Sequence, residues 1–257
     1  LIRPCGGELE VLGLDPRRDA VEVRRRCGYL PGELRLDENV RVRATLTFFR
    51  EIRGGDTGTM KRGEGLAERL GLDLDSKVKT LSKGTKQKVG IVATFMHRPE
   101  LLLLDEPTSG LDPLVQQTVL ELVREARDEG ATVFFSSHVL AEVQNIAGRV
   151  AIIRGGKIVE TGHTAELTGE GMMRVRVKLA NGSRMRSTEF ESLPGVSVLD
   201  VANDGRLFRL SVEEGMDGLV KLLARYDVDA LESGRPSLEE VFLTHYGTGI
   251  EEGEGEE

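Results

Sequence analysis

The sequence is poor in cysteine and has no long apolar segment. Cys5 and Cys27 are the only cysteines among 257 residues. Two isolated cysteines in a chain of this size are typical of reduced cytosolic thiols, and a disulfide between them is the less favoured alternative. A membrane-spanning helix needs roughly 18 or more consecutive apolar residues. No such run occurs, so the sequence predicts no transmembrane helix.

The chain has no excess of positive charge. The chain has 35 Lys and Arg against 43 Asp and Glu, which gives a formal net charge of −8. This balance argues against a general nucleic-acid binder, and we expect no nucleic-acid partner. Several of the acids lie in EEGEGEE at the end of the chain, which has no apolar residue to bury. Residues 249–257 are therefore predicted to be a disordered acidic tail.

The first residues have no feature of a leader. The sequence begins at Leu1 without a methionine, a basic segment or a signal-like apolar segment. CGGELEVLGLDP, residues 5–16, is instead typical of a turn and a short strand within a domain. The chain is thus expected to begin inside a fold.

Alternating strand and helix patterns predict a domain over residues 1–170. The segments LLLL (101–104) and ATVFFSS (131–137) are uniformly apolar or nearly so, as in strands buried on both faces of a parallel sheet. Helical patterns follow Ser82 and Asp112, which are good N-cap residues. Strands that alternate with helices indicate an α/β fold. A helical insert in this domain is predicted over residues 38–80, approximately, with helices over 41–53 and 61–72.

A second domain, small and of α+β type, is predicted over residues 171–248. Asn181-Gly182 lies between MRVRVKL (173–179) and RMRSTEF (184–190), a pattern typical of a β-hairpin. Further strands are predicted at 196–201, 207–212 and 228–231, with helices near 216–226 and from Ser237.

Two carboxylates end the apolar segment LLLLDE, residues 101–106. Ligands of α/β sheets bind at the carboxyl ends of the strands. There Asp105 can hold Mg²⁺, directly or through water, against phosphate oxygens. Glu106 can orient or deprotonate an attacking water. A strand that ends in two solvated acids is the alternative.

LSKGTKQK, residues 81–88, has the features of an anion-binding helix start. The free N–H groups and dipole of a helix N-terminus favour a phosphate, which Gly84 would let approach the backbone. Lys83, Lys86 and Lys88 add positive charge. The alternative is a capped surface helix with solvated lysines.

The order of these motifs resembles the ATPase domain of ABC transporters. Leu81-Ser82-x-Gly84 is followed after one helix by LLLLDEPTSGLDP, and after one further strand by His138. In element order the similarity runs from residue 1 to about 162, and its motif-rich part is 81–138. It implies a P-loop NTPase-like parallel sheet, with ATP and Mg²⁺ as cofactors.

The resemblance also implies roles for particular residues. Leu81 to Thr85 correspond to the family's signature motif, that is Leu81, Ser82, Lys83, Gly84 and Thr85. In this motif Ser82 and Gly84 would contact the γ-phosphate of a nucleotide held by a second ATPase subunit. Lys83 and Thr85 depart from the usual glycine and glutamine. Asp105 corresponds to the magnesium residue and Glu106 to the catalytic carboxylate. The loop between paired subunits corresponds to Ser109 to Asp112, and His138 to the switch histidine that senses the γ-phosphate.

Two parts of the family pattern are missing. Gly32, followed by Glu33, stands where the family has a glutamine that touches Mg²⁺ and couples to the membrane subunit. No segment matches the phosphate cradle G-x-x-x-x-G-K-[ST], because the only Gly-Lys pair, Gly156-Lys157, is followed by Ile158. The family places this cradle upstream of the segment that residues 1–12 resemble. We therefore expect an incomplete ATPase domain, which alone binds MgATP poorly and is inactive.

The end of the chain points to one branch of the family. SLEEVFLTHYG, residues 237–247, resembles the end of ATPase subunits of ABC-2-type exporters. The implied function is ATP hydrolysis in a nucleotide-sandwich dimer, on the cytoplasmic face of the membrane, coupled to a separate transmembrane permease on which the helical insert docks. Two alternatives stay open: a non-catalytic partner that donates only its signature motif, and a soluble ABC-type ATPase of translation or DNA repair.

Overall fold

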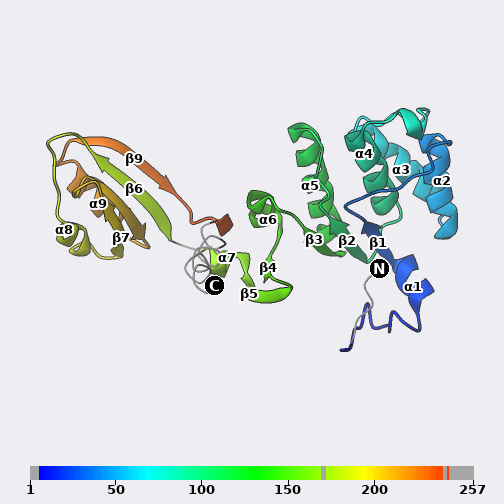
Figure 1. Cartoon of the computed structure of the whole chain (residues 1–257), viewed down its shortest axis with the longest axis horizontal. Coiled ribbons are helices and arrows are strands. Elements are labelled where there is room, and N and C mark those ends of the chain that lie inside the picture. The colour runs from blue at the N-terminus through cyan, green and yellow to red at the C-terminus, as the bar shows by residue number, and fades with distance from the viewer. Residues whose placement is uncertain (1–5, 169–171, 240–241, 243–257) are drawn as a thin grey trace, which may run out of the picture. The chain divides into compact units, whose positions relative to one another are not determined.

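The computed structural model describes residues 6–168, 172–239 and 242. The chain divides into two compact units, Leu1–Glu142 and Val143–Glu257. The first holds the parallel sheet and the helical insert, and the second holds two antiparallel sheets (Figure 1). The predicted α/β and α+β classes are confirmed, while the predicted domain bounds stay predictions.

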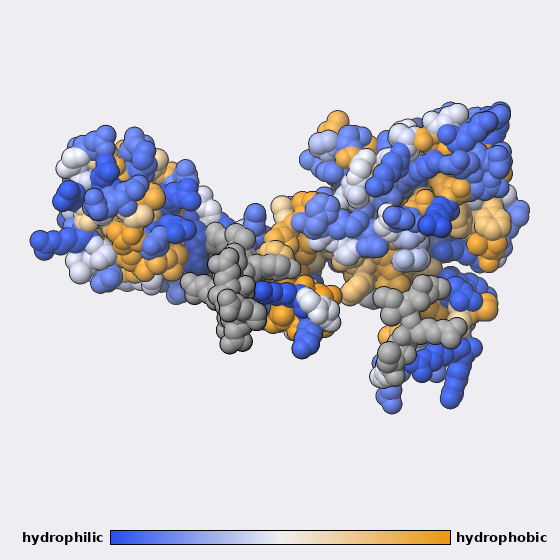
Figure 2. Space-filling model, viewed as in Figure 1, coloured by the Kyte–Doolittle hydropathy of each residue, from blue (hydrophilic) through white to orange (hydrophobic). Residues whose placement is uncertain are grey.

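The first unit is built on three parallel strands in the order β1-β2-β3. They are β1 (Cys27–Leu30), β2 (Leu101–Asp105) and β3 (Thr132–Ser136). In the central strand, Leu102 and Leu104 are buried, at 0% and 2% exposure. Tyr29 and Phe134 are cross-strand neighbours on either side of Leu103, and both are exposed. Apolar surface is visible in this part of the molecule in Figure 2.

Helix α1 (Ala20–Arg26) leads directly into β1, α4 (Lys83–Phe95) precedes β2, and α5 (Pro113–Asp128) connects β2 to β3. The N-caps of α4 and α5 are Ser82 and Asp112, as predicted, and each side chain accepts a hydrogen bond from a backbone N–H of the first turn. The buried residues of α5 are Val119, Leu122 and Val123, which share one face at helical spacing. Their burial attaches the helix that follows β2 to the sheet.

The helical insert consists of α2 (Val42–Ile52), α3 (Thr57–Arg69) and the short 3₁₀ helix η1 (Val78–Thr80). Asp56 caps α3 through Thr59 N–H. Both helices contact α4, beside which they lie in Figure 1. The two predicted helices are thus present, the second beginning at Thr57 rather than at Lys61.

The strand predicted before Pro16 does not form. Val11 and Leu14 make a single antiparallel bridge around Leu12 and Gly13. Both of these residues have positive φ, 53° and 77°. The chain therefore reverses direction at once, and a turn takes the place of the strand.

The second unit begins within helix α6 (Leu140–Ile146) and continues through a hairpin. Its strands, β4 (Arg149–Arg154) and β5 (Lys157–His163), turn at Gly155-Gly156 and lead to the short α7 (Thr164–Leu167). A four-stranded antiparallel sheet follows, in the order β7-β8-β6-β9. It is formed by β6 (Met173–Leu179), β7 (Val196–Ala202), β8 (Leu207–Val212) and β9 (Val228–Gly234).

Helices α8 (Ser187–Glu191) and α9 (Met216–Leu223) complete a β-α-β-β-α-β order, the split βαβ topology of ferredoxin-like folds. Phe190 of α8 and Phe208 of β8 are fully buried, with ring centroids 4.9 Å apart. The hairpin predicted around Asn181-Gly182 is wrong, because the residues after this turn form α8. At the start of the helix, Glu189 Oε1 accepts a hydrogen bond from the backbone N–H of the N-cap residue Arg186 over 3.2 Å, and β6 pairs with β8 and β9 instead.

Some predictions fall on residues outside the described part of the chain. These are the acidic tail, most of residues 237–247 and Cys5. Cys27 is a buried free thiol. Within the described ranges, every helix is too short or too polar to cross a bilayer.

Candidate active site

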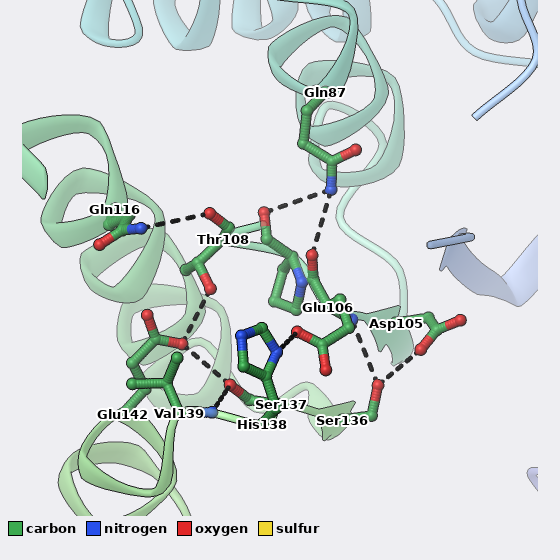
Figure 3. Close-up of polar contacts among 11 residues, drawn as sticks. Gln87, Asp105, Glu106, Thr108, Gln116, Ser136, Ser137, His138, Val139 and Glu142 are labelled. Carbon is green, nitrogen blue, oxygen red and sulfur yellow. Dashed lines mark hydrogen bonds and ion pairs between the residues drawn. The ribbon is translucent and has the colours of Figure 1, made fainter. Parts of the chain in front are cut away.

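Asp105 lies at the carboxyl end of β2 with its carboxylate held on both sides (Figure 3). Ser136 Oγ donates to Asp105 Oδ1 over 2.6 Å, and the backbone N–H of Gly32 donates to Oδ2 over 3.3 Å. Ser136 is the cross-strand partner of Asp105 in β3, so the parallel register supplies the first contact. The carboxylate is thus oriented at the sheet edge where α/β folds bind ligands.

Gly32 stands where the family pattern has a glutamine, and its lack of a side chain matters for Asp105. A Cβ at this position would lie 3.0 Å from Asp105 Oδ2, a closer approach than most side chains tolerate. The absence of a side chain lets the backbone itself contact Asp105. Glu33, the next residue, is exposed.

Glu106 has an unusual backbone conformation, with a φ of +49°. Non-glycine residues adopt this left-handed region at a cost of roughly 1 kcal/mol or more, and such strain clusters at functional sites. Its N–H donates to the carbonyl and the Oγ of Ser136, both over 3.2 Å. These bonds stabilise the strained residue.

The side chain of Glu106 meets His138, which lies between β3 and α6. Glu106 Oε2 is 2.7 Å from His138 Nδ1. An ionised carboxylate only accepts, so Nδ1 carries the proton and Nε2 is left for a ligand. Glu106 is 29% exposed and His138 is 73% exposed. The structure therefore brings together two of the predicted site residues from positions 32 apart and leaves them open to solvent.

The predicted signature residues lie at the start of α4. Ser82 Oγ accepts from Thr85 N–H over 3.1 Å and is 2.9 Å from Thr85 Oγ1. Lys83 is exposed, whereas Leu81 and Gly84 are half-buried. A Cβ on Gly84 would lie 2.5 Å from the carbonyl oxygen of Gly110. Besides its expected role toward phosphate, Gly84 is therefore the point where α4 packs on the loop after β2.

That loop, residues 106–112, is held by two glutamines that the sequence did not single out. Gln87 of α4 is buried and donates to the carbonyls of Glu106 and Pro107, both over 3.4 Å. Gln116 of α5 donates to the carbonyls of Thr108 and Leu111 over 3.4 and 3.1 Å. Both amides are drawn in Figure 3 with bonds to the loop. Ser109 and Asp112, the predicted loop residues, lie on a firmly supported segment.

The oxygen atoms at this edge fit Mg²⁺ held together with a nucleotide. No cluster of three or more His, Cys, Asp or Glu side chains suited to a metal occurs among the described residues. Mg²⁺, however, is usually held by one or two carboxylates together with substrate phosphates. Asp105 offers such a carboxylate, already oriented by Ser136 and Gly32.

Comparison with known proteins gives one family model and many relatives. The model is described as "AAA domain, putative AbiEii toxin, Type IV TA system" and matches residues 64–143. This is less than half of the chain, so it does not by itself place the chain in a family.

Several relatives match nearly the whole chain. A daunorubicin resistance ATP-binding protein of Streptomyces coeruleorubidus is 33% identical over 95% of this chain and 79% of its own. A bacitracin transport ATP-binding protein of Bacillus licheniformis is 29% identical over 97% of this chain and 82% of its own. A solved structure of the ATP-binding subunit of an ABC transporter is 28% identical with a TM-score of 0.62, over 65% of this chain and 70% of that one.

Proposed function

The chain belongs to the ABC transporter ATP-binding proteins, and from this premise we propose that it is the ATP-hydrolysing subunit of an exporter. Relatives named for daunorubicin resistance and bacitracin transport support export of a drug-like or peptide cargo. The subunit would couple hydrolysis of the γ-phosphate to transport through a separate permease at the cytoplasmic face of the membrane.

The observation that carries the proposal is the contact between Glu106 and His138, 2.7 Å apart beside the oriented carboxylate of Asp105. In this arrangement Glu106 orients or deprotonates the attacking water. His138, held through Nδ1, presents Nε2 to the γ-phosphate. Asp105 would hold Mg²⁺, which neutralises phosphate charge when bound.

The signature residues act on a second nucleotide. The start of α4 has free N–H groups and a favourable dipole for an anion, and Lys83 adds a positive charge. A second ATPase subunit would hold the ATP that Ser82 and Gly84 contact. Ser109 and Asp112 would face that same subunit.

The family's main phosphate contacts come from a G-x-x-x-x-G-K-[ST] segment, and this sequence contains none. The chain alone should then bind MgATP weakly and hydrolyse it negligibly. Isothermal calorimetry tests this directly, and micromolar binding by the chain alone would contradict it.

The permease partner would dock on the helical insert. Phe48 and Ile52 lie one turn apart on α2 and are 58% and 59% exposed. Exposed apolar side chains at this spacing are typical of a helix that packs on a partner. A Phe48→Glu variant should lose co-purification with the permease while its circular dichroism stays unchanged.

A soluble ABC-type ATPase of translation or DNA repair is not favoured, since the relatives are transporter subunits. A Glu106→Gln variant in the assembled transporter distinguishes the catalytic function from the non-catalytic alternative. We expect its ATPase rate to fall roughly 100-fold or more while ATP still binds. Glu121→Gln, an exposed carboxylate on α5, is the matched control. Equal rates for Glu106→Gln and the control would refute the catalytic assignment.

A further inference from the structure

Glu142, in the first turn of α6, is a buried carboxylate that the proposed mechanism does not use. It is 8% exposed. Carboxylates are rarely buried to this extent unless they are paired or hydrogen-bonded. Within the described part of the chain, two hydroxyl groups donate to this side chain, and both bonds end on the same oxygen, Oε2 (Figure 3).

The first donor belongs to the loop that carries Glu106. Thr108 Oγ1 donates to Glu142 Oε2 over 2.8 Å, and Thr108 is 3% exposed. Thr108 lies two residues after Glu106, and its carbonyl accepts the bond from Gln116. The loop is therefore fixed from the α6 side by this single oxygen.

The second donor belongs to the segment that carries His138. Ser137 Oγ donates to Glu142 Oε2 over 3.2 Å and accepts from Val139 N–H over 3.0 Å. These two bonds fix the chain immediately before and after His138. One carboxylate oxygen thus connects the two segments whose side chains meet at the Glu106–His138 contact.

We propose that Glu142 is a positioning residue that holds Glu106 and His138 in register through Thr108 and Ser137. Its catalytic meaning rests on the proposed function of that pair. An acid in the first turn of a helix often serves only the helix dipole. Such a role needs neither burial nor bonds to hydroxyls of two other segments, and Glu142 has both.

Variants that keep or remove the hydrogen-bond acceptor at Glu142 test this proposal. Glu142→Gln keeps a carbonyl oxygen that can accept from both hydroxyls, whereas Glu142→Leu keeps the bulk and removes the acceptor. Thr108→Ser and Thr108→Val make the same comparison at the first donor. We expect Glu142→Leu and Thr108→Val each to lower kcat roughly 100-fold in the assembled transporter, because small displacements of catalytic groups cost about that much.

The conservative variants should retain most of kcat, and KM for ATP should stay the same in all four, because Glu142 contacts no reacting atom. A double variant that combines Glu142→Leu with Thr108→Val should be no slower than Glu142→Leu alone, since both changes remove the same bond. Equal losses in Glu142→Gln and Glu142→Leu would overturn the proposal, as would a raised KM with unchanged kcat.

Amide hydrogen exchange on the isolated chain gives a readout that needs no ATPase activity. Glu142→Leu should accelerate exchange at Leu111 and Val139, whose N–H groups bond within the two tethered segments. Val119→Ala, a buried change in α5, is the control for a general loss of stability. Unchanged exchange at both amides would overturn the tether. A Glu106→Gln variant of full activity would count against the proposed function, whereas inactive Glu106→Gln with fully active Glu142→Leu would count against the positioning role alone.

Discussion

His97 should make the stability of the first unit depend on pH. It lies just after α4, where the guanidinium of Arg53 faces its ring with Nη1 3.4 Å from Nδ1. Arg53 also donates to the carbonyl of Cys27 over 3.0 Å. An arginine has no acceptor, so one imidazole nitrogen must accept from Arg53 and the ring must be neutral. Burial, and secondarily the charge of Arg53, lower the pKa of His97 to about 4.

The direction of the effect follows from proton binding. In the unfolded chain a histidine has a pKa of about 6.5, so between this value and about 4 the unfolded state binds the extra proton. Stability is therefore fully present above the unfolded pKa and falls as the pH drops toward 4. Going from pH 7 to pH 5 should cost at most about 2 kcal/mol, and less to the extent that water reaches the ring.

The comparison that isolates this effect is between the wild type and His97→Gln. Urea unfolding is followed at pH 7, 6 and 5, with hydrogen exchange in α4 to report on the first unit. The acids whose pKa is lowered, such as Glu100 and Glu125, lose their contribution only as pH falls below their ordinary range of about 4.3. They do not interfere above pH 5. The same pH dependence in wild type and variant would show that His97 is not held neutral by this site.

Further predictions concern packing. Gly84→Ala should lower stability by about 1–3 kcal/mol, because the added Cβ would meet the Gly110 carbonyl at 2.5 Å. Gly65→Ala on the exposed side of α3, where a Cβ meets nothing within 4 Å, should instead raise stability by about 0.5–1 kcal/mol. Thermal unfolding compares the two, and equal shifts would contradict the close contact. Phe208→Ala should cost about 3–5 kcal/mol in the second unit, read from faster exchange in β6 and β8, and an unchanged exchange rate there would refute its place in that core.

The sequence predicted well those features that depend on the ends of parallel strands. Apolar runs identified β2 and β3, although the predicted burial on both faces is wrong for β3, in which Thr132, Phe134 and Ser136 are exposed. The carboxyl ends of these parallel strands must share one edge of the sheet. The proximity of Asp105, Glu106 and the segment of His138 follows from that rule. The family resemblance added their expected roles, but the 2.7 Å contact between Glu106 and His138 required the structure.

Local patterns failed where distant partners decide the structure. The segment after Asn181-Gly182 is predicted as a strand, yet it becomes α8 because Phe190 is buried against Phe208 and the Glu189 side chain accepts from the N-cap N–H of Arg186. β6 already has β8 and β9 on its two sides, so no edge is left for a hairpin partner. The hairpin signal described the turn correctly and the element after it wrongly.

The residues that support the site differ in how far they could have been foreseen. The contact between Ser136 and Asp105 could be predicted from the register of β2 and β3, since the residue opposite Asp105 must lie beside its carboxylate. The role of Glu142 could not be predicted in this way, because an acid in the first turn of a helix usually needs no partner beyond the helix itself. Its role arises only when Thr108, 34 positions earlier, is folded against the same oxygen that Ser137 reaches. A supporting residue of this kind has no signal in spacing or composition, and its identification depends on burial together with bonds to two separate segments.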